Sequence, residues 1–411
     1  MSNAKRIVVT GAGVISPVGN TVEDAWQGLL EGRNGIAPIT RFDTTDARCH
    51  LAGQVRDFNI EDFLDAKAAS RLDPYCHFAI GAAEQALKQA DLGEETPPER
   101  IGVLVSSGIG GITTTCQQNS IMESKGMGRV SPLCVPMLIS NMASGYLAIR
   151  HNLRGPNFAL VSACATGLHS LGEASWVIRR GDADVMLAGG TETGVVPLGI
   201  AGFGSMRALS ANPDPETASR PFDKNRDGFV PAEGAAVLVL ESEEHARQRG
   251  ATILGELAGY GATCDAYHIT APRPDGSGAA AAIAMALRHA ELNPQDIGYV
   301  NAHGTSTPMN DSIETAALKL AFGEYARQLA ISSVKALTGH MLGAAGAFES
   351  IACLQALRTG VLPPTAHYQT PDPECDLDYI PNIPREAKVD CALNLSLGFG
   401  GHNAAVVFRK Y

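Results

Sequence analysis

The residue best suited to covalent chemistry in this sequence is Cys164, in residues 163–167 (ACATG). The apolar residues 158–161 before it predict a buried strand, and the apolar spacing from Gly167 to Ile178 predicts a helix. Cys164 would then lie on a tight strand-to-helix turn. At such a turn the helix N-terminus lowers the pKa of a thiol, and its free N–H groups can bind an oxyanion. The position predicts a nucleophile, although a buried structural cysteine is the ordinary alternative.

Two histidines later in the chain favour the nucleophile interpretation. His303 lies in residues 301–308 (NAHGTSTP), directly after a predicted strand, and His340 lies in residues 335–343 (KALTGHMLG). A single histidine is more often structural, but two of them at Gly-rich strand ends, together with Cys164, favour a catalytic set. One cysteine and two histidines could also bind zinc. Because the fourth ligand is missing and the separations in sequence are long, we expect no metal site.

Two glycine-rich stretches could bind a ligand through the backbone. Residues 398–401 (GFGG) follow the predicted strand 391–395, and closely spaced glycines can turn their N–H groups toward an anion. A plain hairpin turn is the alternative. Near the N-terminus, Gly11-Ala12-Gly13 follows a predicted strand, but Ser16 stands where a dinucleotide-binding fingerprint has its third glycine. We therefore expect no dinucleotide cofactor.

The elements that must position these residues recur in the two halves of the chain. The repeated elements are residues 86–92 and 286–292, the strands from Ile101 and Ile297, and the Thr-Gly pairs that begin at 166 and 338. Their shared order predicts an internally duplicated α/β fold, with chance similarity as the alternative. We expect the two halves at residues 5–250 and 251–411. Duplication would bring Cys164 and the loop 338–343 into one site.

The composition is that of an ordinary globular protein. The 411 residues are 45% hydrophobic and 18% charged, with a net charge of −11, which argues against non-specific binding to nucleic acid. No apolar run approaches the roughly 20 residues of a membrane span, and we find no secretory signal. Nine cysteines without a CxxC spacing fit a reducing compartment, so we expect a cytoplasmic protein.

Five motifs in this order resemble the β-ketoacyl-[acyl-carrier-protein] synthases of the thiolase superfamily, and among them bacterial synthase II. The motifs are residues 163–167, residues 220–223 with 226–230, residues 301–308, residues 335–343 and residues 398–401. The resemblance covers nearly the whole chain. It implies an α/β, thiolase-like fold of five layers, αβαβα. It also implies a homodimer in which the partner's residues 112–140 complete each acyl pocket.

The activity that the resemblance implies is an acyl transfer followed by a decarboxylative Claisen condensation, in ping-pong order, in fatty-acid elongation. Cys164 would take the acyl group from acyl carrier protein as a thioester, with the N–H groups of Cys164 and Phe399 as the oxyanion hole. His303 and His340 would bind the malonyl thioester and stabilise the enolate formed as CO2 leaves. The substrates are carried on phosphopantetheine, and no other cofactor is implied.

The resemblance also assigns supporting roles. Lys335 would be held by Glu349, with Asp311 and Glu314 supporting this network, and Phe399 would also act as the gate. The pantetheine channel would be lined by Thr305, Thr307 and Thr270, and the acyl pocket by Ile109, Phe203, Leu133 and Cys134. Carrier protein would dock on Lys67, Arg71, Arg129 and Arg207, for which a solvated face is the alternative.

Departures from the family pattern leave other functions open. Leu397, His402 and the pair Leu133-Cys134 replace residues that are usually phenylalanine or threonine, and smaller side chains would widen the acyl pocket. One alternative is therefore a ketosynthase of a polyketide or aryl-polyene pathway. Another is a non-catalytic partner subunit, against which the complete set of Cys164, His303, His340 and Lys335 argues.

Overall fold

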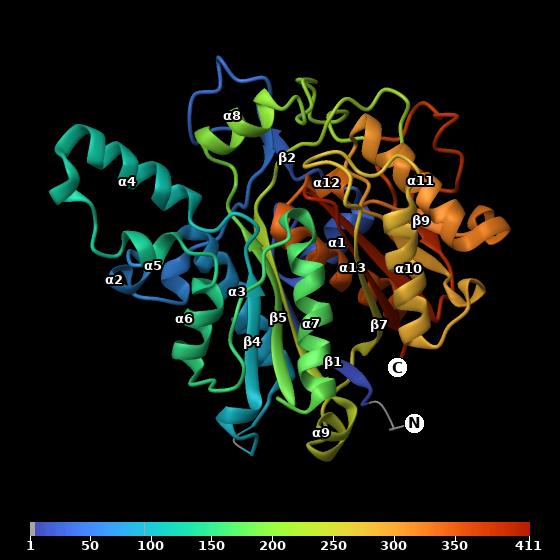
Figure 1. The fold of residues 1–411 in the computed structure, drawn as a ribbon, viewed down its shortest axis with the longest axis horizontal. Helices are drawn as coiled ribbons and strands as arrows, with labels where there is room; N and C mark the ends of the chain where they lie inside the picture. The colour runs from blue at the N-terminus through green and yellow to red at the C-terminus, as the bar shows by residue number, and fades with distance from the viewer. Residues whose placement is uncertain (1–4, 94) are drawn as a thin grey trace.

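A nine-stranded mixed sheet runs through the protein, and the computed structural model describes residues 5–93 and 95–411 (Figure 1). The strands of this sheet are β1 (Ile7–Ile15), β4 (Ile101–Ser106), β5 (Val185–Glu192), β6 (Gly234–Ser242), β7 (Gly255–Cys264), β8 (Tyr299–Asn301), β9 (Ala330–Ser332), β12 (Cys391–Gly398) and β13 (His402–Arg409). Two small hairpins stand apart, β2 (Ile36–Pro38) with β3 (Leu51–Gly53) and β10 (Val361–Leu362) with β11 (Arg385–Glu386).

Several helices begin after a residue whose side chain accepts a hydrogen bond from a backbone N–H group of the first turn. In order, the helices are α1 (Val22–Glu31), α2 (Ala66–Ala69), α3 (Pro74–Ala90), α4 (Ile112–Lys125), α5 (Cys134–Leu138), α6 (Met142–His151), α7 (Thr166–Arg180), α8 (Pro197–Ser205), α9 (Glu243–Gln248), α10 (Ser277–Ala290), α11 (Pro308–Phe322), α12 (Lys335–Thr338) and α13 (Ala345–Thr359). The pattern of residues 20–31 predicts a helix capped by Asn20 or Thr21, and Thr21 caps α1 by accepting from Asp24 N.

The sheet consists of two halves with the same strand order. The order is β4-β5-β6-β1 in the N-terminal half and β8-β12-β13-β7 in the C-terminal half, with β9 outside β8. Antiparallel pairing of β1 with β7, from Ile7 opposite Leu257, joins the halves into one sheet. The repeated order confirms the predicted internal duplication.

Helices cover both halves and fill the space between them. Helices α3 and α6 pack on the N-terminal half, and α10 packs on the C-terminal half together with α11. Helices α7 and α13 contact each other and strands of both halves, so they form a middle layer. This arrangement is the five-layer αβαβα fold that was predicted.

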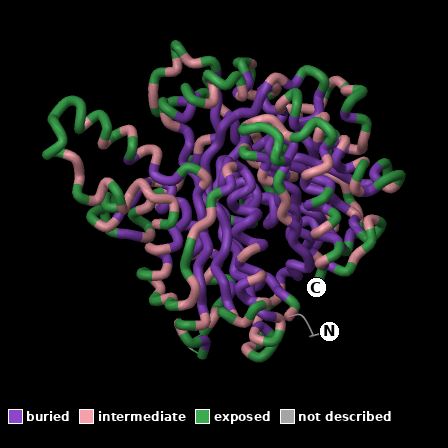
Figure 2. The backbone as a smooth tube through the Cα atoms, viewed as in Figure 1, coloured by how far each residue is buried: buried purple, intermediate pink, exposed green. Residues whose placement is uncertain are grey.

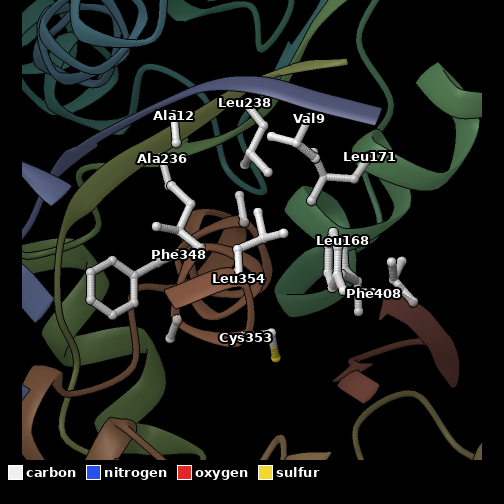
Figure 3. Close-up of a cluster of buried hydrophobic side chains, with 14 of the residues drawn as sticks. Val9, Ala12, Leu168, Leu171, Ala236, Leu238, Phe348, Cys353, Leu354 and Phe408 are labelled. Carbon is white, nitrogen blue, oxygen red and sulfur yellow. The ribbon is translucent and has the colours of Figure 1, made fainter. Parts of the chain in front are cut away.

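The core around the middle layer draws residues from both halves. Val9 and Leu238 come from the N-terminal half-sheet, Phe408 comes from the C-terminal half-sheet, and Leu168 and Phe348 come from the two middle helices (Figure 3). Figure 2 shows that the buried residues fill the centre of the molecule, while α4 is largely exposed. Burying the middle helices on both sides fixes their N-terminal ends, where the candidate catalytic residues lie.

Three local predictions are wrong. Residues 158–161 form no strand, and Phe158 and Val161 are 40% and 53% exposed, because this segment borders only β4 and has no neighbour on its other side. The helical periodicity of residues 67–90 predicts one helix, but two form, since Asp73 caps a new helix at Pro74. The counterpart of the turn at Cys164 is Leu342–Ala344, not the Thr-Gly pair at 338.

Glycines near the N-terminus serve packing. Gly11 and Gly13 lie inside β1 rather than in a loop. A Cβ at Gly11 would lie 2.1 Å from Ala86 O, and one at Gly13 would lie 1.9 Å from Ala82 O. Glycine at these positions lets α3 approach the sheet closely.

Candidate active site

Cys164 lies on a sharp turn that leads directly into a helix. Ala163 has a φ of 50°, a left-handed conformation that residues other than glycine rarely adopt. The 3-10 turn Ala163–Ala165 then runs into α7. A Cβ at Gly167 would lie 2.7 Å from Gly343 O, so the first turn of α7 lies directly against the turn before α13. Close packing of the two middle helices thus places Cys164 where the halves meet.

One cavity of about 620 Å³ brings together residues far apart in the sequence. Cys164, His303, His340 and Phe399 all line it. The rings of His303 and His340 stand edge to face with centroids 5.4 Å apart. Phe229 holds the other side of His340, with ring centroids 5.3 Å apart. The cysteine and both histidines predicted to form a catalytic set therefore share one site.

The imidazoles of this cavity are electrically neutral. Burial lowers the pKa of His303 and His340 well below the usual value, and the nearby charge of Lys335 lowers both further. His303 Nδ1 and both ring nitrogens of His340 are buried and have no hydrogen-bond partner among the described residues. These buried nitrogens therefore keep unused hydrogen-bonding capacity at the edge of the cavity.

The prediction that the pKa of the Cys164 thiol is lowered is wrong for the protein without bound substrate. Burial raises the pKa of Cys164 to about 12, and the negative charge of Glu192 also raises it. The charge of Lys335 lowers it only in part. Desolvation of the thiolate thus outweighs the favourable effect of Lys335. The thiol must therefore give up its proton when it reacts.

A buried ion pair lies behind the cavity. Lys335 Nζ donates to Glu349 Oε1, and both side chains are almost fully buried. Burial raises the pKa of Glu349, while the charge of Lys335 lowers it. Neither residue lines the cavity. Because its charge lowers the pKa of Cys164, His303 and His340, Lys335 acts on the site through its electric field.

Glu314 and Asp311 support the backbone around His303. Glu314 accepts hydrogen bonds from His303 N at 2.6 Å and Gly304 N at 2.7 Å. Burial raises the pKa of Glu314 to about 7. Asp311 accepts from Phe222 N at 2.8 Å and lies 3.8 Å from the guanidinium of Arg226. The two carboxylates thus fix loops and do not touch the ion pair of Lys335.

The other predicted site residues divide into two groups. Those that line the cavity are Thr305, Thr307, Thr270, Phe203 and Arg207. Those that do not are Ile109, Leu133, Cys134, Lys67, Arg71 and Arg129. Lys67, Arg71, Arg129 and Arg207 are all exposed. Arg129 follows α4, which projects from the body of the molecule (Figure 1). A single chain thus forms the entrance and catalytic end of the cavity but not the predicted far end.

Four buried side-chain oxygens on β8, α13 and β12 are left without a hydrogen-bond partner among the described residues. Asn301 Oδ1, Glu349 Oε2, Asn394 Oδ1 and Ser396 Oγ are buried without a hydrogen-bond partner in residues 5–93 and 95–411. Asn301 and Asn394 are opposite each other on β8 and β12. Oxygen-only donors suit a hard cation rather than zinc. The same residues contain no cluster of three or more His, Cys, Asp or Glu side chains that could hold a metal ion.

The sequence interpretation missed Glu192, which ends β5 and is completely buried. It accepts from Ser107 Oγ at 2.6 Å, Gly108 N at 3.0 Å and Gly343 N at 3.1 Å. Its only signal in the sequence is an acidic residue at the end of an apolar strand, followed by Gly194. That pattern does not indicate which groups the carboxylate meets.

Comparison with known proteins gives consistent matches. The family described as "Beta-ketoacyl synthase, N-terminal domain" matches residues 4–246, and "Beta-ketoacyl synthase, C-terminal domain" matches residues 254–369. The 3-oxoacyl-[acyl-carrier-protein] synthase 2 of Synechocystis sp. is 53% identical over 99% of this chain and 98% of that protein. The protein of the same name from Staphylococcus aureus is 50% identical over the full length of both chains.

Solved structures agree in fold. A type II polyketide ketosynthase in complex with its acyl-carrier protein superposes with a TM-score of 0.91, at 36% identity over all of both chains. A beta-ketoacyl synthase from Burkholderia phymatum STM815 gives a TM-score of 0.92, at 33% identity over 99% of this chain and all of that one. Across its whole length, therefore, this chain belongs to the β-ketoacyl synthase family.

Proposed function

We propose that this chain is a 3-oxoacyl-[acyl-carrier-protein] synthase, an acyltransferase that elongates fatty acids by two carbons. The observation that carries the proposal is the meeting of Cys164, His303 and His340 in one cavity, with their imidazole nitrogens free of protein partners. The named relatives support the assignment over their full length. Because Cys164, His303 and His340 are all present, the site argues against a non-catalytic subunit.

Acyl transfer is the first half of the reaction. The sulfur of Cys164 attacks the acyl thioester, its proton passes to a neutral imidazole, and the carrier's thiol leaves with a proton. The N–H groups of Cys164 and Phe399 receive the oxyanion of the tetrahedral intermediate. Burial keeps the thiol protonated until substrate arrives, which protects it from side reactions.

Condensation is the second half. The carbonyl oxygen of the malonyl thioester accepts hydrogen bonds from His303 and His340. The bond to the carboxylate breaks, CO2 leaves, and the electron pair remains as an enolate that these neutral donors stabilise. The enolate carbon attacks the Cys164 thioester, and the sulfur is released. Burial keeps both imidazoles unprotonated, and the charge of Lys335, held by Glu349, lowers their pKa further.

Phosphopantetheine would reach the sulfur through the polar side of the cavity. Thr305 and Thr307 lie with their hydroxyl oxygens 3.0 Å apart, and Thr270 lines the same cavity. The outer lining also contains Arg207, which is exposed. We propose docking of the acidic carrier protein on Arg207 together with Lys67, Arg71 and Arg129. No other cofactor is proposed.

A homodimer is part of the proposal. Exposed apolar side chains gather on α4 to α6 and along the free side of β4, including Met127 at 82% exposure and Ile149 at 76%. Phe158 and Val161 continue this surface beside β4. A second copy would cover it. Because Leu133 and Cys134 do not reach the cavity of their own chain, they would complete the acyl pocket of the partner.

Two further parts of the proposal concern organisation and location. We propose halves at residues 5–250 and 251–411, which the repeated strand order supports. Among the described residues, no helix combines the length and apolar character that crossing a bilayer requires. All nine cysteines lie in the described residues and are unpaired, which supports a cytoplasmic location.

Intact-protein mass spectrometry tests the function. The chain is incubated with acyl-carrier proteins loaded with acyl groups of graded length, and we expect one acyl group on Cys164. Adding malonyl-carrier protein should then remove it and yield a β-ketoacyl product two carbons longer. Absence of acylation by every chain length would refute the proposal.

A polyketide ketosynthase is the second candidate. Solved ketosynthases of this kind share the fold, and the smaller residues Leu397 and Cys134 favour a roomier pocket. With excess malonyl-carrier protein and no reductase, a fatty-acid enzyme should stop after one condensation. Repeated condensation to a poly-β-ketone would support the polyketide function instead.

A further inference from the structure

The internal duplication gives Glu192 and Cys164 counterparts in the opposite halves. β5 and β12 are both eight residues long, occupy the same place in the strand order, and end at Glu192 and Gly398. The turns before α7 and α13 also match, because Leu342 has a φ of 48° where Ala163 has 50°. Gly343 therefore corresponds to Cys164, and Glu192 corresponds to Gly398.

In the C-terminal half glycine takes this position. A Cβ at Gly398 would lie 2.5 Å from Ser162 O, 3.2 Å from Ala165 N and 3.4 Å from Cys164 N. The end of β12 therefore packs directly against the turn that carries Cys164, and a side chain there would crowd the N–H group of Cys164. Gly398 and Cys164 both line the cavity, so the absence of a side chain leaves room for an oxyanion of the substrate at that N–H group.

In the N-terminal half the same position is filled. The carboxylate of Glu192 accepts from Gly343 N at 3.1 Å, which is the counterpart of Cys164 N. A Cβ at Gly343 would lie 2.8 Å from the carboxylate, so glycine is required beside it. The N-terminal half thus places the carboxyl group of Glu192 against Gly343 N. The C-terminal half leaves the equivalent position beside Cys164 N for the substrate.

The same carboxylate fastens the loop 107–110. Glu192 accepts from Ser107 Oγ at 2.6 Å, Gly108 N at 3.0 Å and Ile109 N at 3.3 Å. Leu342, next to Gly343, packs in one apolar cluster with Cys164. A Cβ at Gly194 would lie 2.9 Å from Leu342 and 3.7 Å from Ile109. The loop and the turn before α13 are therefore joined beside the nucleophile.

We propose that Glu192 is a positioning residue for acylation of Cys164, an internal carboxyl group that occupies the duplicate of the oxyanion site and locks the loop 107–110 onto the turn at Gly343. The proposal rests on the proposed function, because it concerns the acyl pocket of that reaction.

Chemical rescue tests the proposal. Glu192→Ala removes the equivalent of an acetate ion from a buried site that keeps its N–H donors. With octanoyl-carrier protein, we expect the rate of acylation of Cys164 to fall about 100-fold, because the loop and turn lose their shared anchor. Added acetate should restore the rate in a saturable way, and the bulkier pivalate should not. Thermal denaturation establishes that the variant is folded.

Two matched variants complete the experiment. Glu192→Gln keeps the volume but places an amide N–H₂ group against an N–H donor, so we expect a loss of about tenfold that acetate does not restore. Glu241→Ala is the control. It removes a buried carboxylate near the end of β6 that binds Arg249, and when this variant is folded we expect Cys164 to be acylated at the normal rate. If Glu192→Ala does not fold, acylation by Glu192→Gln at the wild-type rate would overturn the proposal.

Failure of the inference differs from failure of the function. If wild-type protein is not acylated, the proposed function is wrong. If wild type is acylated and folded Glu192→Ala either reacts at the same rate or stays slow at every acetate concentration, the inference about Glu192 is wrong while the function stands.

Discussion

Separating the structural role of the Lys335–Glu349 pair from its catalytic role is the sharpest test of the mechanism. Both side chains are nearly inaccessible to water, and each is the other's charge partner. Lys335→Met or Glu349→Gln leaves a buried charge without its partner. The double variant Lys335→Met with Glu349→Leu removes both charges and keeps similar volumes.

The expected stability changes follow from burial. Removing one member of a buried ion pair costs about 3–5 kcal/mol, whereas replacing both by apolar residues is nearly neutral. An unfolding entropy of about 2.1 cal/mol/K per residue corresponds to a decrease in Tm of about 3–6 °C for each single variant of a chain this long. The double variant should return close to the wild-type Tm. Arg154→Met, which breaks an exposed pair with Glu99, is the control and should leave Tm unchanged.

Decarboxylation activity and Tm should respond differently to these substitutions. Malonyl decarboxylation should be lost in Lys335→Met and stay lost in the double variant, because the charge that lowers the pKa of His303 and His340 in addition to burial is absent in both. Differential scanning calorimetry and CO2 release measure the two properties on the same samples. A double variant that regained decarboxylation together with stability would show that the pair is only structural, and the electrostatic argument would fail.

Three further predictions concern the same site. Cys164→Ala should abolish condensation but retain decarboxylation of malonyl-carrier protein; normal elongation by this variant would end the mechanism. Decarboxylation should show no acidic limb at pH 6.5 in a kcat/KM profile, because burial keeps His303 and His340 neutral until the pH falls well below the usual histidine pKa; a titration near 6.5 would contradict this. Lys67→Glu with Arg207→Glu should raise the apparent KM for carrier-bound substrates about tenfold, with little change in kcat; an unchanged KM would refute the docking face.

Local sequence patterns predicted the elements that depend on near neighbours. The helix from Gly167, the cap at Thr21 and the strand from Ile7 follow from apolar spacing and capping chemistry, which act over a few residues. The internal duplication could also be predicted from the sequence, because each half repeats the same order of elements. The strand predicted over residues 158–161 was wrong, since the segment bridges β4 only at Asn157 and leaves Phe158 and Val161 exposed.

The sequence by itself determined which reactive groups this protein has and which turns carry them. Tertiary structure decided what those groups are chemically: burial turned a thiol expected to be acidic into one whose pKa is about 12, and it made the imidazoles neutral. It also gave Glu192 its role, because its partners come from the loop 107–110 and from Gly343, which are far away in the chain. The physical reason is that a helix terminus acts along the local backbone, whereas desolvation and hydrogen bonding depend on every segment that packs around a group.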